Sequence, residues 1–417
     1  MSDTHSASLD RLQLAVAALV AAATTMLLQL ALLITIDVRA TDHGTPLRDV
    51  LTKWDAQWMM NIADHGYFGP PIDQSVAFFP GYPVLVRAVG APLAIFGAPD
   101  ATLVTAIGAS VLTSLAASAG LAVLALDIWT RLGLPITLAT LIAVPMAAAV
   151  AFSGAPMSVI YWMPYSESLF TALATWSLVA MIRRRFLTAG VLVLLAGVTR
   201  LTGAALVATL AVAALIELIS WYRRRHEDDR RFPWRAAVAP MISGAGLAAY
   251  LTWASIRTVD VGGYFAVQDR GWNSAFDGGR ATLTWLRDTL VEGFGDPVST
   301  GYTISSWAMV AVAALVLVSL WPLIRGWLPW QMWKTGGVLV GIVLGSDGVM
   351  HSRPRLLLMA TALLVLPFAV RAVHAAASAR GWRRWASSAV LLIAAVGWCA
   401  AGFWVSTTML VDFKYGI

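Results

Sequence analysis

Long uninterrupted runs of apolar residues are the feature that most constrains how this chain can fold. A helix needs about 20 apolar residues to cross the hydrocarbon core of a bilayer. Eleven runs approach this length: 12–36, 101–126, 134–152, 165–182, 186–198, 202–221, 236–256, 303–324, 335–349, 356–371 and 386–410. We therefore predict an all-α polytopic membrane protein, a single domain over residues 1–417, with about 11 transmembrane helices in a range of 9 to 13.

The composition excludes several other classes of protein. Of 417 residues, 59% are hydrophobic and 12% are charged, whereas a soluble domain is about 25% charged. Unbroken apolar runs also disfavour a β-barrel, whose strands alternate apolar and polar residues. Cys399 is the single cysteine, so a disulfide framework and a cysteine metal cluster are excluded. Because no nucleotide fingerprint and no firm metal-ligand spacing occur, we expect neither a cofactor nor a metal.

The distribution of charge predicts the orientation. The net charge of +6 could suggest a nucleic-acid partner. With the N-terminus in the cytoplasm, however, the inner side holds 17 of the 29 basic and 7 of the 23 acidic residues, including the Arg-rich loop 223–235. This bias follows the positive-inside rule. We predict an integral protein of the inner (plasma) membrane that binds no nucleic acid, and the preference for Arg over Lys suggests a bacterial source.

Two segments on the predicted outer side, 37–100 and 257–302, are too long to be simple connectors. Both are dense in aromatic residues, which is typical of a belt at the lipid headgroups. Charged residues are interleaved with them, however, and such charges near a membrane usually face a cavity or a partner. We therefore interpret 37–100 as a catalytic first loop with interfacial amphipathic helices, and 257–302 as a second large extracytoplasmic loop.

The first loop carries three candidate polar residues. Asp55 lies between Trp54 and Trp58, where it could cap a surface helix or take a proton from an attacking hydroxyl. Asp64 and His65 follow, and either belong to a solvated turn or contact a substrate.

Later segments add an acid and several cations on the same side. Glu167 begins an apolar run, a costly place for a charge unless it faces a cavity or a basic partner. Arg200 could extend its charge to the membrane surface or pair with a lipid phosphate. His351, Arg353 and Arg355 interrupt the positive-inside pattern, and their cluster suits an anionic lipid headgroup.

Several of these residues lie in motifs that resemble a known family. The first-loop signature of the PIG-V family, GPI mannosyltransferase II, is resembled by Trp54-Asp55-Ala56, then Ile62-Ala63 with Gly66-Tyr67, then Ala77-Phe78-Phe79-Pro80 with Tyr82-Pro83. Residues 164–170 and 196–203 resemble its second and third motifs, and residues 268–272 and 352–358 resemble weaker later ones.

This resemblance implies a GT-C membrane glycosyltransferase that inverts the anomeric centre and uses a polyprenyl-phosphate-mannose donor. Asp55 matches the acid expected to act as general base. Our own inference adds phosphate contacts by Arg200, His351, Arg353 and Arg355. The residues predicted to contact acceptor or sugar are Trp54, Trp58, Asp64, His65, Tyr67, Tyr165, Glu167, Gln268 and Trp272, among which Tyr165 and Glu167 could instead orient Arg200.

The resemblance leaves the substrates open. A bacterium is not expected to make GPI, so we predict a lipid or lipoglycan acceptor on the extracytoplasmic side, an α-mannoside product and a monomeric enzyme. The same chemistry with another polyprenyl-phosphate sugar, such as arabinofuranose, is one alternative. A lipid or solute transporter or flippase is the other, although few charges lie in the span centres and no inverted repeat is recognisable.

Overall fold

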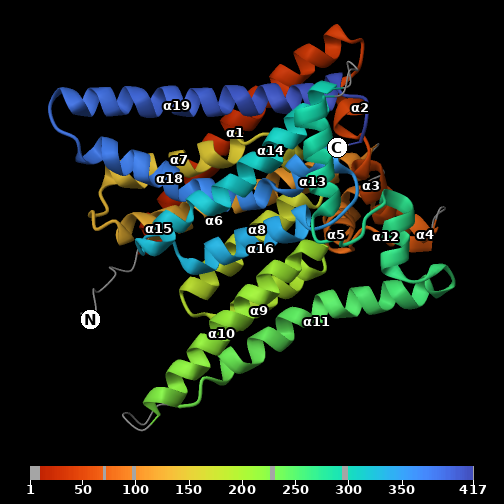
Figure 1. Cartoon of the computed structure of the whole chain (residues 1–417), viewed down its shortest axis with the longest axis horizontal. Helices are drawn as coiled ribbons and strands as arrows, with labels where there is room; N and C mark the ends of the chain where they lie inside the picture. The colour runs from red at the N-terminus through yellow and green to blue at the C-terminus, as the bar shows by residue number, and fades with distance from the viewer. Residues whose placement is uncertain (1–9, 69–71, 96–99, 226–230, 294–298, 417) are drawn as a thin grey trace.

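The computed structural model describes residues 10–68, 72–95, 100–225, 231–293 and 299–416, and these residues form a bundle of helices (Figure 1). In this part of the chain the only β-type pairing is an isolated antiparallel bridge between Phe276 and Ser346. The prediction of an all-α polytopic membrane protein is therefore confirmed. The segments 69–71, 96–99, 226–230 and 294–298, which belong to the predicted outer loops and the Arg-rich loop, lie outside the described residues.

Among the described residues, seven helices are long and apolar enough to cross a membrane. They are α1 (Arg11–Asp42), α6 (Ala101–Arg131), α10 (Ala204–Arg224), α11 (Trp234–Arg257), α14 (Ser299–Val318) with its continuation α15 (Leu320–Ile324), α18 (Leu358–Ser378) and α19 (Trp382–Thr407). Four shorter helices overlap the remaining predicted spans: α7 (Leu138–Ser153), α8 (Glu167–Ile182), α9 (Phe186–Gly197) and α16 (Trp330–Leu344).

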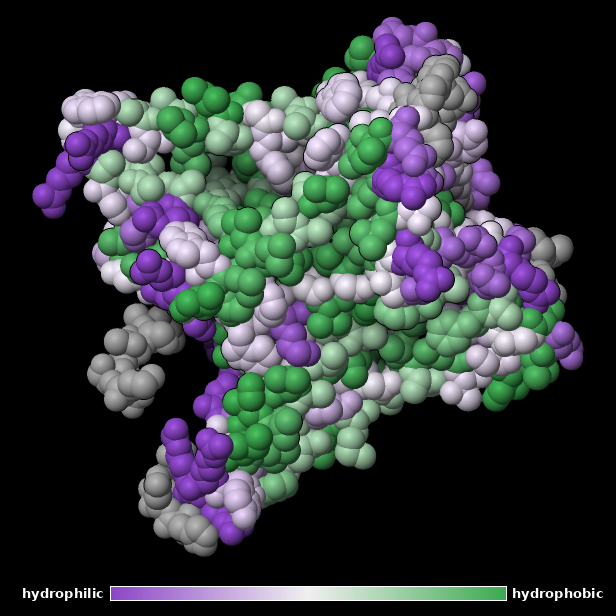
Figure 2. Space-filling view, viewed as in Figure 1, coloured by the Kyte–Doolittle hydropathy of each residue, from purple (hydrophilic) through white to green (hydrophobic). Residues whose placement is uncertain are grey.

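The face of the bundle seen in Figure 2 is largely apolar in its middle and polar at two opposite ends. Apolar side chains such as Leu19, Leu27 and Ile34 of α1 and Leu392 and Ile393 of α19 are exposed. A soluble monomer rarely exposes so large an apolar surface, so the band between the polar ends is the part that lipid covers.

Most of the short helices gather at one polar end, at the right of Figure 1. They are α2 (Leu47–Leu51), α3 (Asp55–His65), α4 (Ile72–Ser75), α5 (Gly81–Ile95), α12 (Tyr264–Trp272) and α13 (Arg280–Arg287). The short helix α17 (Arg353–Leu356) joins them through an ion pair between Arg355 and Asp55. The C-terminal end of α10, the N-terminal end of α11 and the connection between α18 and α19 lie at the opposite end. The described parts of the two segments predicted as outer loops therefore share one end of the bundle, and the arginine-bearing ends of α10 and α11 lie at the other.

Several helix boundaries differ from the hydropathy prediction; α6 and α18, for example, end at Arg131 and Ser378, beyond the predicted 126 and 371. The first helix continues six residues beyond position 36, to Asp42. The ninth predicted span, 335–349, is shifted toward the N-terminus: α16 begins at Trp330, directly after Pro329, and ends at Leu344. Residues 345–349 form a turn instead, in which Gly348 has a φ of 127° that other residues rarely adopt.

A row of serines on α6 supports the irregular connection between α7 and α8. Ser114 accepts a hydrogen bond from the Trp162 indole at 3.0 Å, and Ser110 donates to the Met163 carbonyl at 2.6 Å. Such partners are required because non-helical backbone inside a membrane protein must have its polar groups satisfied by protein. The connection is thereby held where it leads directly into Glu167, the first residue of α8.

Helices α9 and α11 pack closely through small residues. A Cβ atom on Gly246 of α11 would lie 2.7 Å from the Leu194 carbonyl oxygen of α9, and one on Gly190 of α9 would lie 3.0 Å from the Ala239 carbonyl oxygen of α11. Glycines allow such close approach of backbones between membrane helices. This packing holds the C-terminal end of α9, after which Arg200 follows.

Candidate active site

Asp55 is the first residue of α3, at the end of the bundle that carries the short helices. The preceding residue, Trp54, has φ 56° and ψ −117°, a conformation that costs a non-glycine residue about 1–3 kcal/mol. The N-terminus of α3 carries partial positive charge, which favours a carboxylate there. The sharp turn at Trp54 thus separates Lys53 from Asp55 and directs the Asp55 side chain into the bundle.

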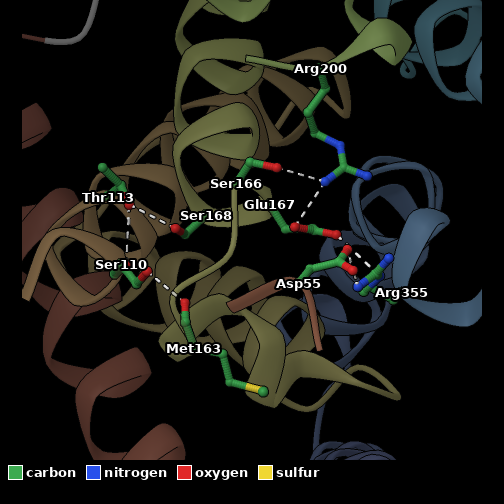
Figure 3. Close-up of polar contacts among 9 residues, drawn as sticks. All are labelled: Asp55, Ser110, Thr113, Met163, Ser166, Glu167, Ser168, Arg200 and Arg355. Carbon is green, nitrogen blue, oxygen red and sulfur yellow. Dashed lines mark hydrogen bonds and ion pairs between the residues drawn. The ribbon is translucent and has the colours of Figure 1, made fainter. Parts of the chain in front are cut away.

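Asp55 belongs to a network in which two acids and two arginines alternate (Figure 3). Arg355 Nη1 lies 2.7 Å from Asp55 Oδ2, and Arg355 Nε lies 3.4 Å from Glu167 Oε1. Glu167 Oε2 lies 2.8 Å from Arg200 Nη1. The four residues come from α3, α17, α8 and the turn after α9, and their formal charges sum to zero.

The members of this network differ in exposure. The side chains of Glu167 and Arg355 are 6% and 9% exposed, whereas that of Asp55 is 22% exposed. A buried ion pair costs desolvation energy and needs partners on both sides, which the alternation of charges supplies. Asp55 is the acid of the network that a substrate hydroxyl could reach most easily.

Glu167 retains capacity to accept hydrogen bonds. Both carboxylate oxygens lie in ion pairs, yet neither has a hydrogen-bond partner of good geometry among the described residues. Buried polar atoms without a hydrogen-bond partner call for an explanation, such as a bound ligand that supplies the partner. A substrate hydroxyl donating to Glu167 would do so.

Arg200 lies in the turn between α9 and the short 3-10 helix Leu201–Gly203. Besides its ion pair with Glu167, its Nη1 donates a hydrogen bond to Ser166 Oγ at 2.9 Å. Ser166 immediately precedes α8 and forms no capping hydrogen bond with that helix. Its hydroxyl therefore serves to fix the guanidinium of Arg200.

Tyr165 joins the network to the start of α3. The Arg355 guanidinium lies over its ring, 5.0 Å from the centroid. The Tyr165 hydroxyl donates to the Lys53 carbonyl at 3.1 Å. The same tyrosine therefore contacts the arginine that pairs with Asp55 and the backbone two residues before Asp55.

Burial and charge act in opposite directions on Asp55. Burial raises the pKa of Asp55 above its usual value, and Arg355 works against this by favouring the carboxylate. Burial also lowers the pKa of Arg355, but Asp55 and Glu167 outweigh it and leave that pKa raised. A carboxylate that remains ionised but has a raised pKa is suited to accept a proton near neutral pH.

Close packing at Gly81 fixes the segment that carries Arg200. The Gly81 amide donates to the Val198 carbonyl at 2.8 Å. A Cβ atom at Gly81 would overlap the Thr199 hydroxyl and would lie 3.0 Å from both Thr199 Cα and the Val198 oxygen. The first-loop run 77–83 thus holds the residue next to Arg200, which explains why a glycine occupies this position.

The structure does not bring Arg353 and His351 into the network. Arg353 is buried and donates through Nη1 to Thr282 Oγ1 at 2.5 Å, and through Nη2 to the Ser346 carbonyl. His351 lies among aromatic rings, with Phe413 at 5.3 Å and Tyr302 at 5.7 Å between centroids. Burial lowers the pKa of His351, which favours its neutral form.

Two of the aromatic residues predicted to contact sugar form a cluster with Phe78. The Trp58 ring stacks on Phe78 with centroids 5.5 Å apart, and Trp272 meets the edge of Phe78 at 5.4 Å. Both tryptophans are only partly buried. Trp54 is likewise partly buried, and the Lys53 ammonium lies 5.4 Å from its ring centroid.

Tyr67 and Gln268 hold the backbone of the first loop. The Tyr67 hydroxyl donates to the Phe78 carbonyl at 2.6 Å. Gln268 Nε2 donates to the Ala77 carbonyl at 3.1 Å and to the Tyr264 hydroxyl at 2.9 Å. The Tyr67 hydroxyl and the Gln268 amide nitrogen are therefore occupied in fixing residues 77 and 78.

Asp64 and His65 lie at the far end of α3 from Asp55. Nine or ten residues of helix correspond to about 14 Å. The Asp64 carboxylate accepts a hydrogen bond from Thr102, and His65 Nδ1 lies 2.9 Å from Asn61 Oδ1. Both side chains are exposed, and the structure places them apart from the network.

Sequence reasoning missed two contributions to the site. No role is predicted for Lys53 from the sequence, although its ammonium donates to the Leu410 carbonyl at 2.9 Å, close to the C-terminus. No role is predicted for Gly81 either, although it packs against Thr199. The rarity of lysine in this sequence was the signal that could have drawn attention to Lys53.

Within the described part of the chain, no group of three or more His, Cys, Asp or Glu is placed to hold a metal ion. The network at Asp55 pairs its acids with arginines instead of with one another.

Comparison with known proteins gives one match. A family model described as "Mannosyltransferase (PIG-V)" matches residues 15–251, more than half of the chain. The matched region includes Asp55, Glu167 and Arg200, whereas Arg355 lies beyond it. No curated protein and no solved structure matches the chain.

Proposed function

This chain belongs to the PIG-V mannosyltransferase family, and we propose that it transfers mannose from a polyprenyl-phosphate-mannose donor to a lipid or lipoglycan acceptor. The observation that carries the proposal is Asp55, a partly exposed carboxylate with a raised pKa, held by Arg355 at the polar end of a membrane bundle. The family match supports a membrane mannosyltransferase. The donor, the acceptor and the stereochemistry belong to the proposal.

In the proposed reaction Asp55 acts as general base. It takes the proton from an acceptor hydroxyl as that oxygen attacks the anomeric carbon of mannose. The bond between the anomeric carbon and the phosphate oxygen breaks, and polyprenyl phosphate leaves with the bonding electrons. A β-linked donor then gives an α-mannoside, and Asp55 returns its proton to water.

The neighbours of Asp55 have positioning roles in this proposal. Arg355 keeps the Asp55 carboxylate ionised and oriented, because the two are 2.7 Å apart. Glu167 accepts a hydrogen bond from a hydroxyl of the acceptor or of mannose, since its buried oxygens lack good hydrogen-bond partners. Arg200 fixes Glu167 through their ion pair at 2.8 Å.

The aromatic side chains beside α3 extend the proposed site. Trp58 and Trp272 are partly buried against Phe78, and their accessible faces could stack on a sugar ring. The phosphate contacts predicted for Arg200, His351, Arg353 and Arg355 stay predictions. The two arginines of the network already pair with carboxylates.

We place the site on the extracytoplasmic side of the inner membrane, in a GT-C type of enzyme. The charge bias of the sequence supports this side. A donor linked to a membrane lipid agrees with a site at the end of the helices, where a lipid phosphate lies at the headgroup level. Without a nucleotide fingerprint in the sequence, a lipid-linked donor is also the simplest source of the sugar.

The substitution Asp55→Asn tests the proposal, because it nearly preserves the shape of the side chain and removes its basicity. With purified protein in lipid nanodiscs, radiolabelled polyprenyl-phosphate mannose and membrane lipid extract, turnover should fall roughly 100-fold or more. Asp49→Asn, an exposed acid in the neighbouring helix α2, is the matched control and should keep wild-type turnover. Wild-type turnover by Asp55→Asn would remove Asp55 as the base.

A further inference from the structure

Lysine is rare in this chain, and two of its lysines meet at one place. Lys53, Lys334 and Lys414 are the only lysines among 29 basic residues. Lys53 and Lys414 lie far apart in the sequence, yet both line one open cavity beside the start of α3. In a chain whose other basic residues are almost all arginine, two of the three lysines therefore line the same cavity.

The cavity has a volume of about 450 Å³ and lies between the first loop and the C-terminal segment. Its walls include Lys53, Trp54, Gln57, Asp412, Phe413 and Lys414. The C-terminal segment after α19 folds back over Trp54, since a Cβ atom on Gly416 would lie 3.3 Å from Trp54 Cδ1. Lys53 Nζ donates to the Leu410 carbonyl at 2.9 Å and joins the two walls.

The charge in this cavity is positive. Asp412 is the one acid in its wall, and its carboxylate pairs with Arg39 at 3.0 Å and lies 3.5 Å from His43 Nε2. The two ammonium groups are therefore not neutralised by Asp412. Burial lowers the pKa of Lys53, and a bound anion would oppose that effect.

In the network around Asp55, by contrast, both arginines are already paired with carboxylates. Arg355 pairs with Asp55 and Glu167, and Arg200 pairs with Glu167. A phosphate that approached the network would meet two carboxylates as well as two guanidiniums. The cations for an anionic substrate must come from elsewhere, and Lys53, two residues before Asp55, is close in the chain.

We propose that this cavity binds the phosphate of a lipid-linked substrate through the ammonium groups of Lys53 and Lys414, with Gln57 as a further hydrogen-bond donor. The proposal rests on the mannosyl transfer proposed above and names a binding subsite for it. It also assigns a role to the C-terminal segment, which lies outside the region matched by the family model.

The donor is the source of phosphate that the chemistry favours. The phosphodiester of polyprenyl-phosphate mannose carries one negative charge, and the leaving polyprenyl phosphate gains a second as the glycosidic bond breaks. Two lysines lining a cavity at the start of α3 would stabilise this increase of charge. Lysine presents a compact charge with three donors and is a recurrent phosphate ligand.

Binding measurements on the full-length protein in nanodiscs test the subsite without turnover. The probes are decaprenyl monophosphate and phosphatidylinositol, titrated separately and followed by native mass spectrometry. Lys53→Gln and Lys414→Gln should each weaken binding of decaprenyl monophosphate about tenfold. Lys334→Gln, which removes the remaining lysine on α16, should leave it within twofold of wild type, and added salt should weaken the wild type most.

Each outcome decides the assignment. Weaker binding of decaprenyl monophosphate by both variants supports the donor subsite. Weaker binding of phosphatidylinositol alone supports a phosphate subsite but assigns it to the acceptor. Affinities equal to wild type for both probes overturn the proposal. Lys414 lies in an exposed segment after the last helix, so its variant stays informative if Lys53→Gln lowers the melting temperature. Failure of mannosyl transfer with intact lysine-dependent binding would refute the proposed function alone.

Discussion

Arg355→Gln should move the pH dependence of turnover in a direction and by an amount that the structure defines. Arg355 Nη1 lies 2.7 Å from Asp55 Oδ2, and the guanidinium is almost fully buried. An opposite charge at such a distance lowers the pKa of a carboxyl group by about 1–3 units. Glutamine keeps much of the side-chain volume and a hydrogen-bond donor but removes this charge.

The sign of the effect follows from the role of Asp55. A general base works only when it is ionised, so turnover falls as the pH drops through the pKa of Asp55. Burial already raises that pKa, and Arg355 lowers it. Loss of the Arg355 charge leaves Asp55 buried near Glu167, so the acidic limb of kcat/KM should move upward by about 1–3 pH units. Activity lost at pH 7 should return at higher pH.

The assay is the pH profile of kcat/KM with radiolabelled donor and protein in nanodiscs. Arg353→Gln is the matched control: it removes a guanidinium that is equally buried but bonded to Thr282 and Ser346. The acidic limb of this control should coincide with that of wild type. An unchanged acidic limb in Arg355→Gln, or a loss of activity that no pH restores, would refute the reasoning about Asp55.

Two further predictions concern packing and orientation. Gly81→Ala should destabilise the protein by about 1–3 kcal/mol and lower turnover, because its Cβ would overlap Thr199 next to Arg200. Thermal unfolding and the activity assay check this prediction. A melting temperature and a turnover equal to those of wild type would contradict it. Asn273→Cys, at an exposed position after α12, should react with an impermeant thiol reagent added outside the cell. The variant is made in a Cys399→Ser background, which removes the native thiol. Labelling only after permeabilisation would invert the predicted topology.

The helical architecture was predictable because each membrane span requires a long apolar run, and such runs are visible without any alignment. The boundaries were less predictable. Hydropathy located the apolar part of α16 but missed its first turn, where Pro329 precedes polar residues at Gln331 and Lys334. It also extended the span into residues 345–349, where Gly348 permits a turn. Local backbone geometry decides these ends, and hydropathy does not register it.

The sequence marked the residues of the network as candidates but did not predict their contacts. A Glu167 in an apolar run called for a cavity or a basic partner, and in the structure it pairs with Arg200 and Arg355. By contrast, Arg353 and Arg355 looked equivalent in the sequence, and only Arg355 reaches Asp55. The 3-10 turn at Met350–Ser352 and the short helix α17 direct the two side chains apart.

The contribution of the C-terminal segment could not be predicted. Lys414 is separated from Lys53 by most of the chain, and no local pattern links them. The meeting of the two lysines depends on where α19 ends relative to α3, which is a property of the packed bundle. The same holds for Gly81, whose role is visible only when Thr199 lies against it.

The most direct test of the central claim is the product balance of the purified protein. Protein in nanodiscs is incubated with polyprenyl-phosphate mannose and membrane lipid extract, and the lipids are quantified by mass spectrometry. We predict that polyprenyl phosphate and a lipid carrying one additional hexose form in equal amounts, and that Asp55→Asn abolishes both. Release of polyprenyl phosphate without a hexosylated lipid, or equal product formation by Asp55→Asn, would contradict the proposed mannosyl transfer at Asp55.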